Sequence, residues 1–117
     1  MLELAVMLPK IHRFASRKDF AEVKENGRLV PGRFWGMLIL KREDNLPSRF
    51  GFVVSKKIDK RAVVRNRLRR QLAGAVLALV SEIKPGWGII FLVKKSLIGQ
   101  EFTAIKNETA RCLKNLS

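Results

Sequence analysis

The sequence predicts an α+β fold in which a single sheet of about four strands has helices packed on it. Short apolar runs bounded by turn residues alternate along the chain with segments whose apolar residues recur at helical spacing. The length of 117 residues is enough for one hydrophobic core, so residues 1–117 are expected to form one domain. A hydrophobic fraction of 47% is typical of a folded chain and not of a disordered one.

The first expected elements are an irregular lead-in and a short helix. Residues 1–15 are expected to form an irregular lead-in, of which residues 1–12 are expected to be flexible. Ser16 followed three residues later by Asp19 resembles a capping box, so a helix is expected over 17–26. Gly27 is placed to end it.

Three strands are expected next, over 28–30, 33–41 and 49–55. The turn sequence EDNLP at 43–47 predicts that the last two form a hairpin. The remaining expected elements are a basic helix over 61–83 ended by Pro85 and Gly86, a buried strand over 87–93 and an amphipathic helix over 99–115.

The charge of the chain points to an anionic partner. Lys and Arg number 24 against 10 acids, which gives a net charge of +14 and a pI near 11.0. A domain with so much positive charge is expected to bind nucleic acid or an anionic membrane surface. No apolar run is long enough to span a bilayer, and the first eight residues lack the features of a signal peptide. The lone Cys112 fits a reducing compartment, so a cytoplasmic protein without a membrane partner is expected.

The basic charge is concentrated in residues 55–72, SKKIDKRAVVRNRLRRQL, which contain one acid, Asp59. Apolar residues at helical spacing within and after this run predict a helix with one side in the core: Val64, Leu68, Leu72, Ala75, Val76 and Leu79. Like charges four residues apart, such as Arg65 and Arg69, destabilise a helix by roughly 0.2–0.5 kcal/mol per pair. A solvated basic face explains any single arginine, but the whole set favours binding to a phosphate backbone.

The sequence SKK followed by A-x-x-R-N-R-x-R-R resembles the signature of the bacterial ribonuclease P protein subunit. The resemblance implies a left-handed β-α-β crossover, an exception to the right-handed rule that is shared with a domain of a small-subunit ribosomal protein. It also implies that the chain binds the catalytic RNA of ribonuclease P. The residues expected at that contact are Lys56, Lys57, Lys60, Arg61, Ala62, Arg65, Asn66, Arg67, Arg69 and Arg70.

The resemblance further implies a site for the single-stranded 5′ leader of precursor tRNA. Aromatic side chains exposed beside cations can stack on unpaired bases. The residues expected at the leader site are Phe20, Lys24, Phe34, Trp35 and Phe52. This chain departs from the family pattern at Lys24, where a second aromatic is common, and at Ala73, where another basic residue is usual.

No catalytic or metal-binding residues are expected on the protein itself. Its single histidine, His12, lies in the irregular lead-in, and Cys112 lies on the apolar stripe of the last helix. The carboxylates are scattered, whereas a metal-dependent nuclease needs a converging set. The resemblance implies that the RNA subunit cleaves the leader with its own Mg²⁺, so the protein is expected to carry no cofactor. It is also expected to need no obligatory protein partner.

Three other functions remain open from the residues. A ribosomal or RNA-chaperone protein would have similar composition, although the arginine signature argues against it. A stand-alone ribonuclease would have to use His12 as its acid or base. A DNA-binding helix-turn-helix is disfavoured, because a strand and not a helix is expected just before the basic helix.

Overall fold

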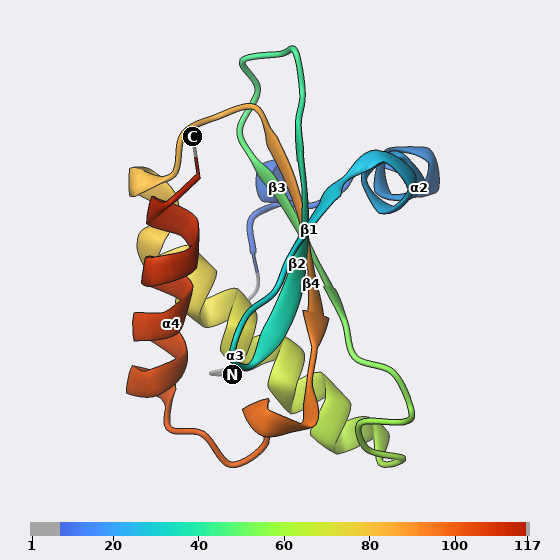
Figure 1. Ribbon diagram of the computed structural model, residues 1–117, viewed down its shortest axis with the longest axis vertical. Helices are drawn as coiled ribbons and strands as arrows, with labels where there is room; N and C mark the ends of the chain where they lie inside the picture. The colour runs from blue at the N-terminus through green and yellow to red at the C-terminus, as the bar shows by residue number, and fades with distance from the viewer. Residues whose placement is uncertain (1–7, 117) are drawn as a thin grey trace.

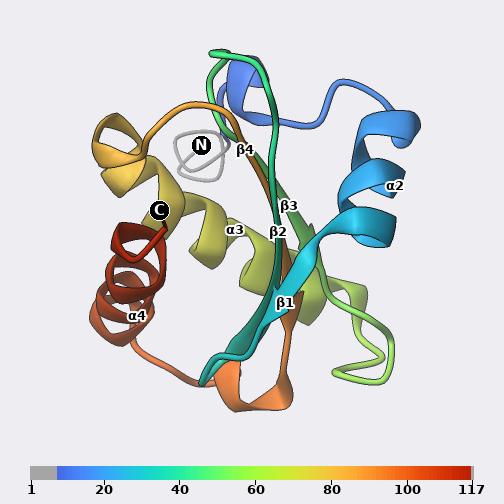
Figure 2. The ribbon, with the colours of Figure 1, turned by 45° about the horizontal axis from the view of Figure 1, so that its top comes forward.

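A four-stranded mixed sheet separates the helices into two layers in this computed structural model, which describes residues 8–116 (Figure 1). The predicted α+β class is confirmed. In chain order the elements are η1 (Lys10–His12), α2 (Arg17–Asn26), β1 (Arg28–Val30), β2 (Trp35–Lys41), β3 (Arg49–Val53), α3 (Ala62–Leu79), η2 (Val80–Glu82), β4 (Trp87–Val93), η3 (Lys95–Leu97) and α4 (Phe102–Lys114). Helices α3 and α4 cover one face of the sheet, and α2 lies on the other (Figures 1 and 2).

Most of the predicted elements are confirmed close to their expected bounds. Helix α2 and strands β1 and β4 begin and end where the sequence predicts, and Ser16 caps α2 by accepting a hydrogen bond from the Asp19 amide at 3.2 Å. The expected helix 61–83 is α-helical only as far as Leu79 and then tightens into the 3-10 turn η2. No helix within residues 8–116 is long and apolar enough to cross a membrane.

The expected hairpin between residues 33–41 and 49–55 is wrong. The strand order is β1-β2-β4-β3, so β4 lies between the two strands that were expected to pair. Strand β4 is antiparallel to β2 and parallel to β3. The reason is burial: six of the seven residues of β4 are buried, and a strand so apolar on both faces is stabilised by a central position. The parallel pair β3 and β4 is joined through α3, and the left-handedness of this crossover stays a prediction.

Strand register divides the residues of the sheet between two different environments. Trp35 pairs with Val93, and Met37 with Phe91, and these buried residues belong to the core that includes α3 and α4. The intervening positions face α2, since a Cβ added to Gly88 would meet Val23 of α2 at 2.7 Å. The bulky aromatic side chains of β2 and β4 therefore belong to the α3/α4 face.

The lead-in residues 8–15 lie against the edge of the sheet at β3. Leu8 is buried, and Arg13 forms an isolated parallel bridge with Phe50. The Nδ1 atom of His12 donates a hydrogen bond to the Ser48 carbonyl at 2.8 Å. Residues 8–12 thus make defined contacts, and the rest of the lead-in that was expected to be flexible, residues 1–7, lies outside the described residues.

Substitution of Gly88 tests how closely α2 is seated on the sheet. Gly88→Ala is expected to lower the free energy of unfolding by about 1–3 kcal/mol, because the new methyl group overlaps the fully buried Val23. Urea unfolding measures the change. The matched control is Gly36→Ala, whose Cβ would meet Leu29 at an ordinary 3.4 Å. Equal losses in the two variants would contradict the close seating of α2.

Candidate nucleic-acid interface

Helix α3 has one side in the core and the other at the surface. The apolar stripe predicted from the sequence is confirmed, since all six of its residues are buried: Val64, Leu68, Leu72, Ala75, Val76 and Leu79. Burial of this stripe sets the rotation of the helix about its axis. The basic residues between the stripe positions are therefore turned towards solvent or the edge of the sheet.

All ten residues expected to meet the catalytic RNA lie at the surface of α3 or of the loop before it. Seven are exposed: Lys56, Lys57, Lys60, Arg61, Ala62, Asn66 and Arg67. Arg65, Arg69 and Arg70 are half-buried. The chain therefore brings this set together on one continuous segment, with no member in the core. We name these ten residues the basic face.

Asp59 organises the loop that leads into α3. Its carboxylate accepts hydrogen bonds from the Arg61 amide at 2.8 Å and from the Arg61 guanidinium at 3.1 and 3.0 Å. The side-chain hydrogen bond from Arg61, followed by the backbone one, lowers the pKa of Asp59 from 3.8 to about 2. The one acid in the basic run therefore offsets the charge of Arg61 and stabilises the turn.

Two arginines of α3 are oriented by neutral acceptors. Arg65 donates from Nη1 to the carbonyls of Asp59 and Lys60, at 3.0 and 2.8 Å. Arg69 donates from Nη1 to the side-chain oxygen of Asn66 at 2.8 Å. Within residues 8–116, no ion pair joins Arg65, Arg67 or Arg69 to a carboxylate. These hydrogen bonds hold the side chains in place without cancelling their charge.

A hollow of about 400 Å³ lies where the lead-in, α2, β3 and α3 meet. Its apolar lining residues are Leu8, Phe14, Phe20, Phe50, Gly51, Phe52 and Ala73, and its cations are Arg13, Arg69 and Arg70. We name it the aromatic pocket. It borders the basic face directly, because Arg69 and Arg70 belong to both. Two of the residues expected at the leader site, Phe20 and Phe52, therefore lie beside two of those expected to meet the RNA.

Two aromatic rings and a glycine form one wall of the aromatic pocket. The rings of Phe14 and Phe20 meet edge to face with centroids 5.5 Å apart. A Cβ added to Gly51 would lie 3.0 Å from the Phe20 ring and 3.2 Å from the Phe14 ring. The absence of a side chain at Gly51 lets both rings approach β3 closely. Phe20 is half-buried, so part of its ring is accessible to a ligand.

The assignment of Phe34 and Trp35 to an exposed stacking surface is wrong. They are 3% and 0% exposed, and the Trp35 ring packs edge-on against Phe91 at 5.3 Å. For Trp35 the reason is strand parity, since it occupies a position of β2 that faces α3 and α4. Phe34 precedes β2 and packs in the same buried cluster, with its ring centroid 6.0 Å from that of Trp35. Phe52 is half-buried, stacks on Phe91 at 5.4 Å and lines the aromatic pocket from the strand edge.

Lys24 and Ala73, the two departures from the family pattern, lie differently with respect to the aromatic pocket. Lys24 is exposed on α2 and does not line the aromatic pocket. Ala73, by contrast, does line it, beside Arg69 and Arg70. The small side chain of Ala73 leaves room in the pocket that a long basic side chain would occupy.

The leader-site residues expected from the sequence leave out several residues that line the aromatic pocket, among them Arg13 and Phe14 of the lead-in. Neither residue was assigned to the leader site or to the RNA contact, yet both line the pocket. The sequence did contain a signal for this role, because Arg13 and Phe14 place a cation beside an aromatic residue just before the capping residue of α2. The β-bridge between Arg13 and Phe50 brings Arg13 and Phe14 to the pocket, and the sequence does not reveal this bridge.

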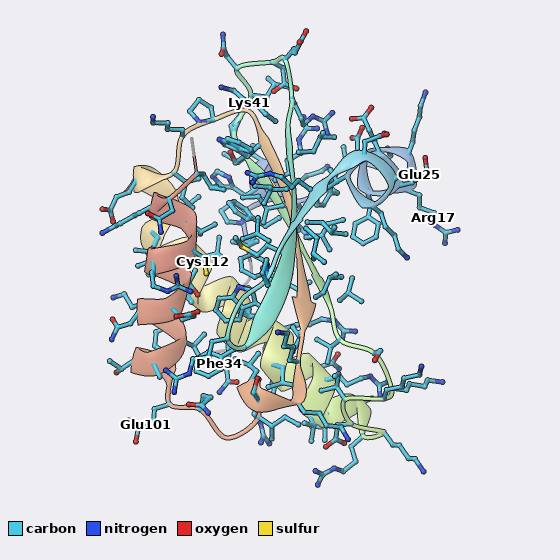
Figure 3. All side chains as sticks on the ribbon, viewed as in Figure 1. Arg17, Glu25, Phe34, Lys41, Glu101 and Cys112 are labelled. Atoms are coloured by element: carbon cyan, nitrogen blue, oxygen red, sulfur yellow. The ribbon has the colours of Figure 1, made fainter. Side chains whose placement is uncertain are left out.

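The side chains that could serve acid–base or metal chemistry are dispersed. His12 is engaged with the Ser48 carbonyl, and Cys112 is half-buried on the side of α4 toward the sheet, where burial raises the pKa of its thiol (Figure 3). Within residues 8–116, no group of three or more His, Cys, Asp or Glu side chains is arranged to hold a metal ion. Within the described residues, it is cations and apolar side chains that come together, in the basic face and the aromatic pocket.

Comparison with known proteins identifies relatives over most of the chain. The family described as Ribonuclease P matches residues 8–117. The ribonuclease P protein component of Microcystis aeruginosa is 40% identical over 96 residues, covering 78% of this chain and 78% of the relative. That of Carboxydothermus hydrogenoformans is 40% identical over 105 residues, covering 87% of this chain and 89% of the relative.

Solved structures share the fold. The ribonuclease P protein from Thermotoga maritima matches with a TM-score of 0.79 at 24% identity, covering 90% of this chain and 97% of that one. The protein from Staphylococcus aureus matches with a TM-score of 0.77 at 25% identity, covering 90% of this chain and 94% of that one. The arrangement of sheet and helices described above is therefore common to these proteins.

The link between Asp59 and Arg61 can be tested by titration. Because Asp59 has a lower pKa in the folded chain, its carboxylate contributes stability that is complete above pH 3.8 and is lost as the pH falls through about 2. In Arg61→Ala the pKa of Asp59 is expected to rise toward 3.8 but to stay below it, since the amide of residue 61 still donates. NMR carboxyl shifts against pH measure this. Arg67→Ala is the control, and an unchanged pKa in Arg61→Ala would contradict the assignment.

Proposed function

The chain belongs to the bacterial ribonuclease P protein family, and on that premise we propose that it binds both the catalytic RNA and the 5′ leader of precursor tRNA. A protein component of ribonuclease P is a subunit of an endoribonuclease complex and associates with ribonuclease P RNA. The finer proposal is that the basic face docks on the RNA subunit and the aromatic pocket receives the leader. The protein thereby assists the cleavage that forms the mature tRNA 5′ end.

The observation that carries the proposal is the orientation of the α3 arginines by neutral acceptors. Arg65 and Arg69 are held by backbone carbonyls and by Asn66, and they keep their positive charge. A phosphate backbone supplies the missing counter-charge and releases its own counterions on binding. Contacts of this kind carry little sequence information, so they suit docking on the backbone of a folded RNA.

The aromatic pocket supports the leader assignment through its composition. Unpaired bases stack on accessible aromatic rings, and Phe20 presents part of its ring beside Arg13 and Arg69. Such stacking tolerates any base, as a protein that serves many precursors requires. Phe52 lines the same pocket, whereas Phe34 and Trp35 have no part in this proposal because they are buried.

The proposal assigns the hydrolysis of the phosphodiester bond to the RNA subunit, which the family resemblance implies uses Mg²⁺. The described residues of the protein would position the substrate and neutralise phosphate charge. A reconstitution assay tests the whole proposal: the protein should stimulate cleavage of precursor tRNA by the RNA subunit at moderate salt and should not cleave RNA alone. Cleavage by the protein alone, abolished in His12→Ala, would instead support a stand-alone ribonuclease.

Binding of the RNA subunit should depend on salt through the basic face. Arg69→Ala and Arg65→Ala are each expected to weaken this binding and to flatten the plot of log affinity against log salt by about one unit per lost phosphate contact. The control is Lys106→Ala, which removes an exposed cation of α4 on a different surface. Filter binding over a range of salt concentrations measures the slopes. Unchanged slopes in both arginine variants would remove the basic face as the RNA site.

Leader binding should depend on Phe20. Phe20→Ala is expected to reduce the affinity of the reconstituted enzyme for precursor tRNA by roughly 1–3 kcal/mol, the contribution of stacking on one base. Affinity for mature tRNA and for the RNA subunit should not change. Phe102→Ala, which removes a 44% exposed phenylalanine of α4, is the matched control. Equal losses for precursor and mature tRNA would contradict the assignment.

A further inference from the structure

A second hollow adjoins the aromatic pocket between the lead-in and the loop that connects β2 to β3. It has a volume of about 520 Å³ and shares Arg13 and Phe14 with the aromatic pocket. The two hollows therefore meet at these two side chains. We name this hollow the lead-in pocket, and its other lining residues are Lys10, Ile11, Ala15, Leu46, Pro47 and Arg49.

The two walls of the lead-in pocket are tied together by a chain of hydrogen bonds. His12, in the η1 wall, donates to the carbonyl of Ser48, in the opposite wall, at 2.8 Å. The Ser48 hydroxyl donates in turn to the Lys84 carbonyl at 2.6 Å and accepts from the Trp87 amide at 3.1 Å. Ser48 is 3% exposed, so these bonds are shielded from water. The pocket is thus preformed, which lowers the entropic cost of binding a ligand.

The lining of the lead-in pocket combines exposed apolar side chains with cations. Ile11 and Leu46 are 60% and 49% exposed, and they come from the two opposite walls. Lys10 and Arg13 are also exposed, and no lining residue is acidic. Arg49 contributes less charge, because Asp19 pairs with it at 3.5 Å. Apolar surface for a base beside cations for its phosphate is the combination that single-stranded nucleic acid requires.

The position of the lead-in pocket relative to α3 suggests which part of an RNA strand it would hold. The aromatic pocket is lined by Arg69 and Arg70 of α3, whereas no residue of α3 lines the lead-in pocket. A leader that approaches from an RNA docked on the basic face would reach the aromatic pocket first. It would then pass Phe14 to enter the lead-in pocket.

We propose that the lead-in pocket is a second nucleotide site, which binds leader nucleotides lying 5′ of those in the aromatic pocket. This inference rests on the proposed function, since it requires the leader to occupy the aromatic pocket. A base packs on Ile11, Leu46 and Pro47, and the adjoining phosphates lie near Lys10 and Arg13. The leader-binding surface is therefore longer than the aromatic pocket alone.

The test compares leader lengths in the reconstituted holoenzyme. Dissociation constants are measured for precursor tRNAs whose leaders are shortened one nucleotide at a time, and for mature tRNA. Leu46→Ser and Lys10→Ala are each expected to weaken binding of the longest leader about tenfold, and to have no effect once the leader is too short to pass Phe14. The loss of affinity caused by Phe20→Ala should persist at leader lengths too short to show the effects of Leu46→Ser and Lys10→Ala.

Ile98→Ser is the matched control for Leu46→Ser, because it removes a 40% exposed aliphatic side chain that lines neither pocket. It should leave binding unchanged at every leader length. Far-ultraviolet circular dichroism and thermal unfolding confirm that the variants fold. Since Leu46 and Lys10 are exposed, neither substitution should alter the core.

Two results would overturn the lead-in pocket as a second nucleotide site. One is no loss of affinity in Leu46→Ser and Lys10→Ala at any leader length. The other is a loss that is equal for long leaders, short leaders and mature tRNA, which would indicate contact with the tRNA body. In either case a precursor-specific effect of Phe20→Ala would leave the leader assignment of the aromatic pocket intact, whereas its absence would remove that assignment and this inference with it.

Discussion

Packing of the α3 stripe against the sheet is the interaction on which the rest of the structure depends. Leu68, Leu72 and Val76 belong to the same buried cluster as Ile89 and Phe91 of β4. Burying an apolar side chain of this size stabilises the fold by about 1.5–3 kcal/mol, several times the repulsion between two arginines one turn apart. The hydrophobic contribution therefore dominates, and it presents the arginines outward in one fixed orientation.

The two faces of the sheet carry different kinds of side chain. The α3/α4 face takes the large aromatic side chains of β2 and β4, including Trp35 and Phe91. The α2 face carries Gly51 and Gly88, where Phe14, Phe20 and Val23 approach the strands closely. On the α2 side, the aromatic rings that line the aromatic pocket therefore come from the lead-in and from α2, and not from the strands. The lead-in, held through His12 and Ser48, therefore contributes to the proposed binding surface alongside α3.

Much of the candidate site could be predicted from local sequence because it lies on one helix and one loop. The buried stripe and the α3 part of the basic face depend only on helical periodicity, and both lie where that periodicity indicated. Asp59, by contrast, has a role that charge counting did not show, since its hydrogen bonds to Arg61 depend on the local turn. Trp35 was misassigned because alternation along a strand does not say which parity faces α3 and α4. Phe34 precedes β2, and its burial in the same cluster depends on tertiary packing that alternation does not describe.

The sequence by itself determined the fold class, the positions of most elements and the surface location of the α3 cations, because each depends on periodicity or charge within one segment. Only the tertiary structure decided that β4 inserts between β2 and β3, and that Arg13 and Phe14 of the lead-in meet Phe20 of α2. These features join residues far apart in the chain, and their partners are chosen by the most favourable burial of the whole molecule. The apolar run over 87–93 predicted a buried strand, but a local pattern does not say between which two strands it lies.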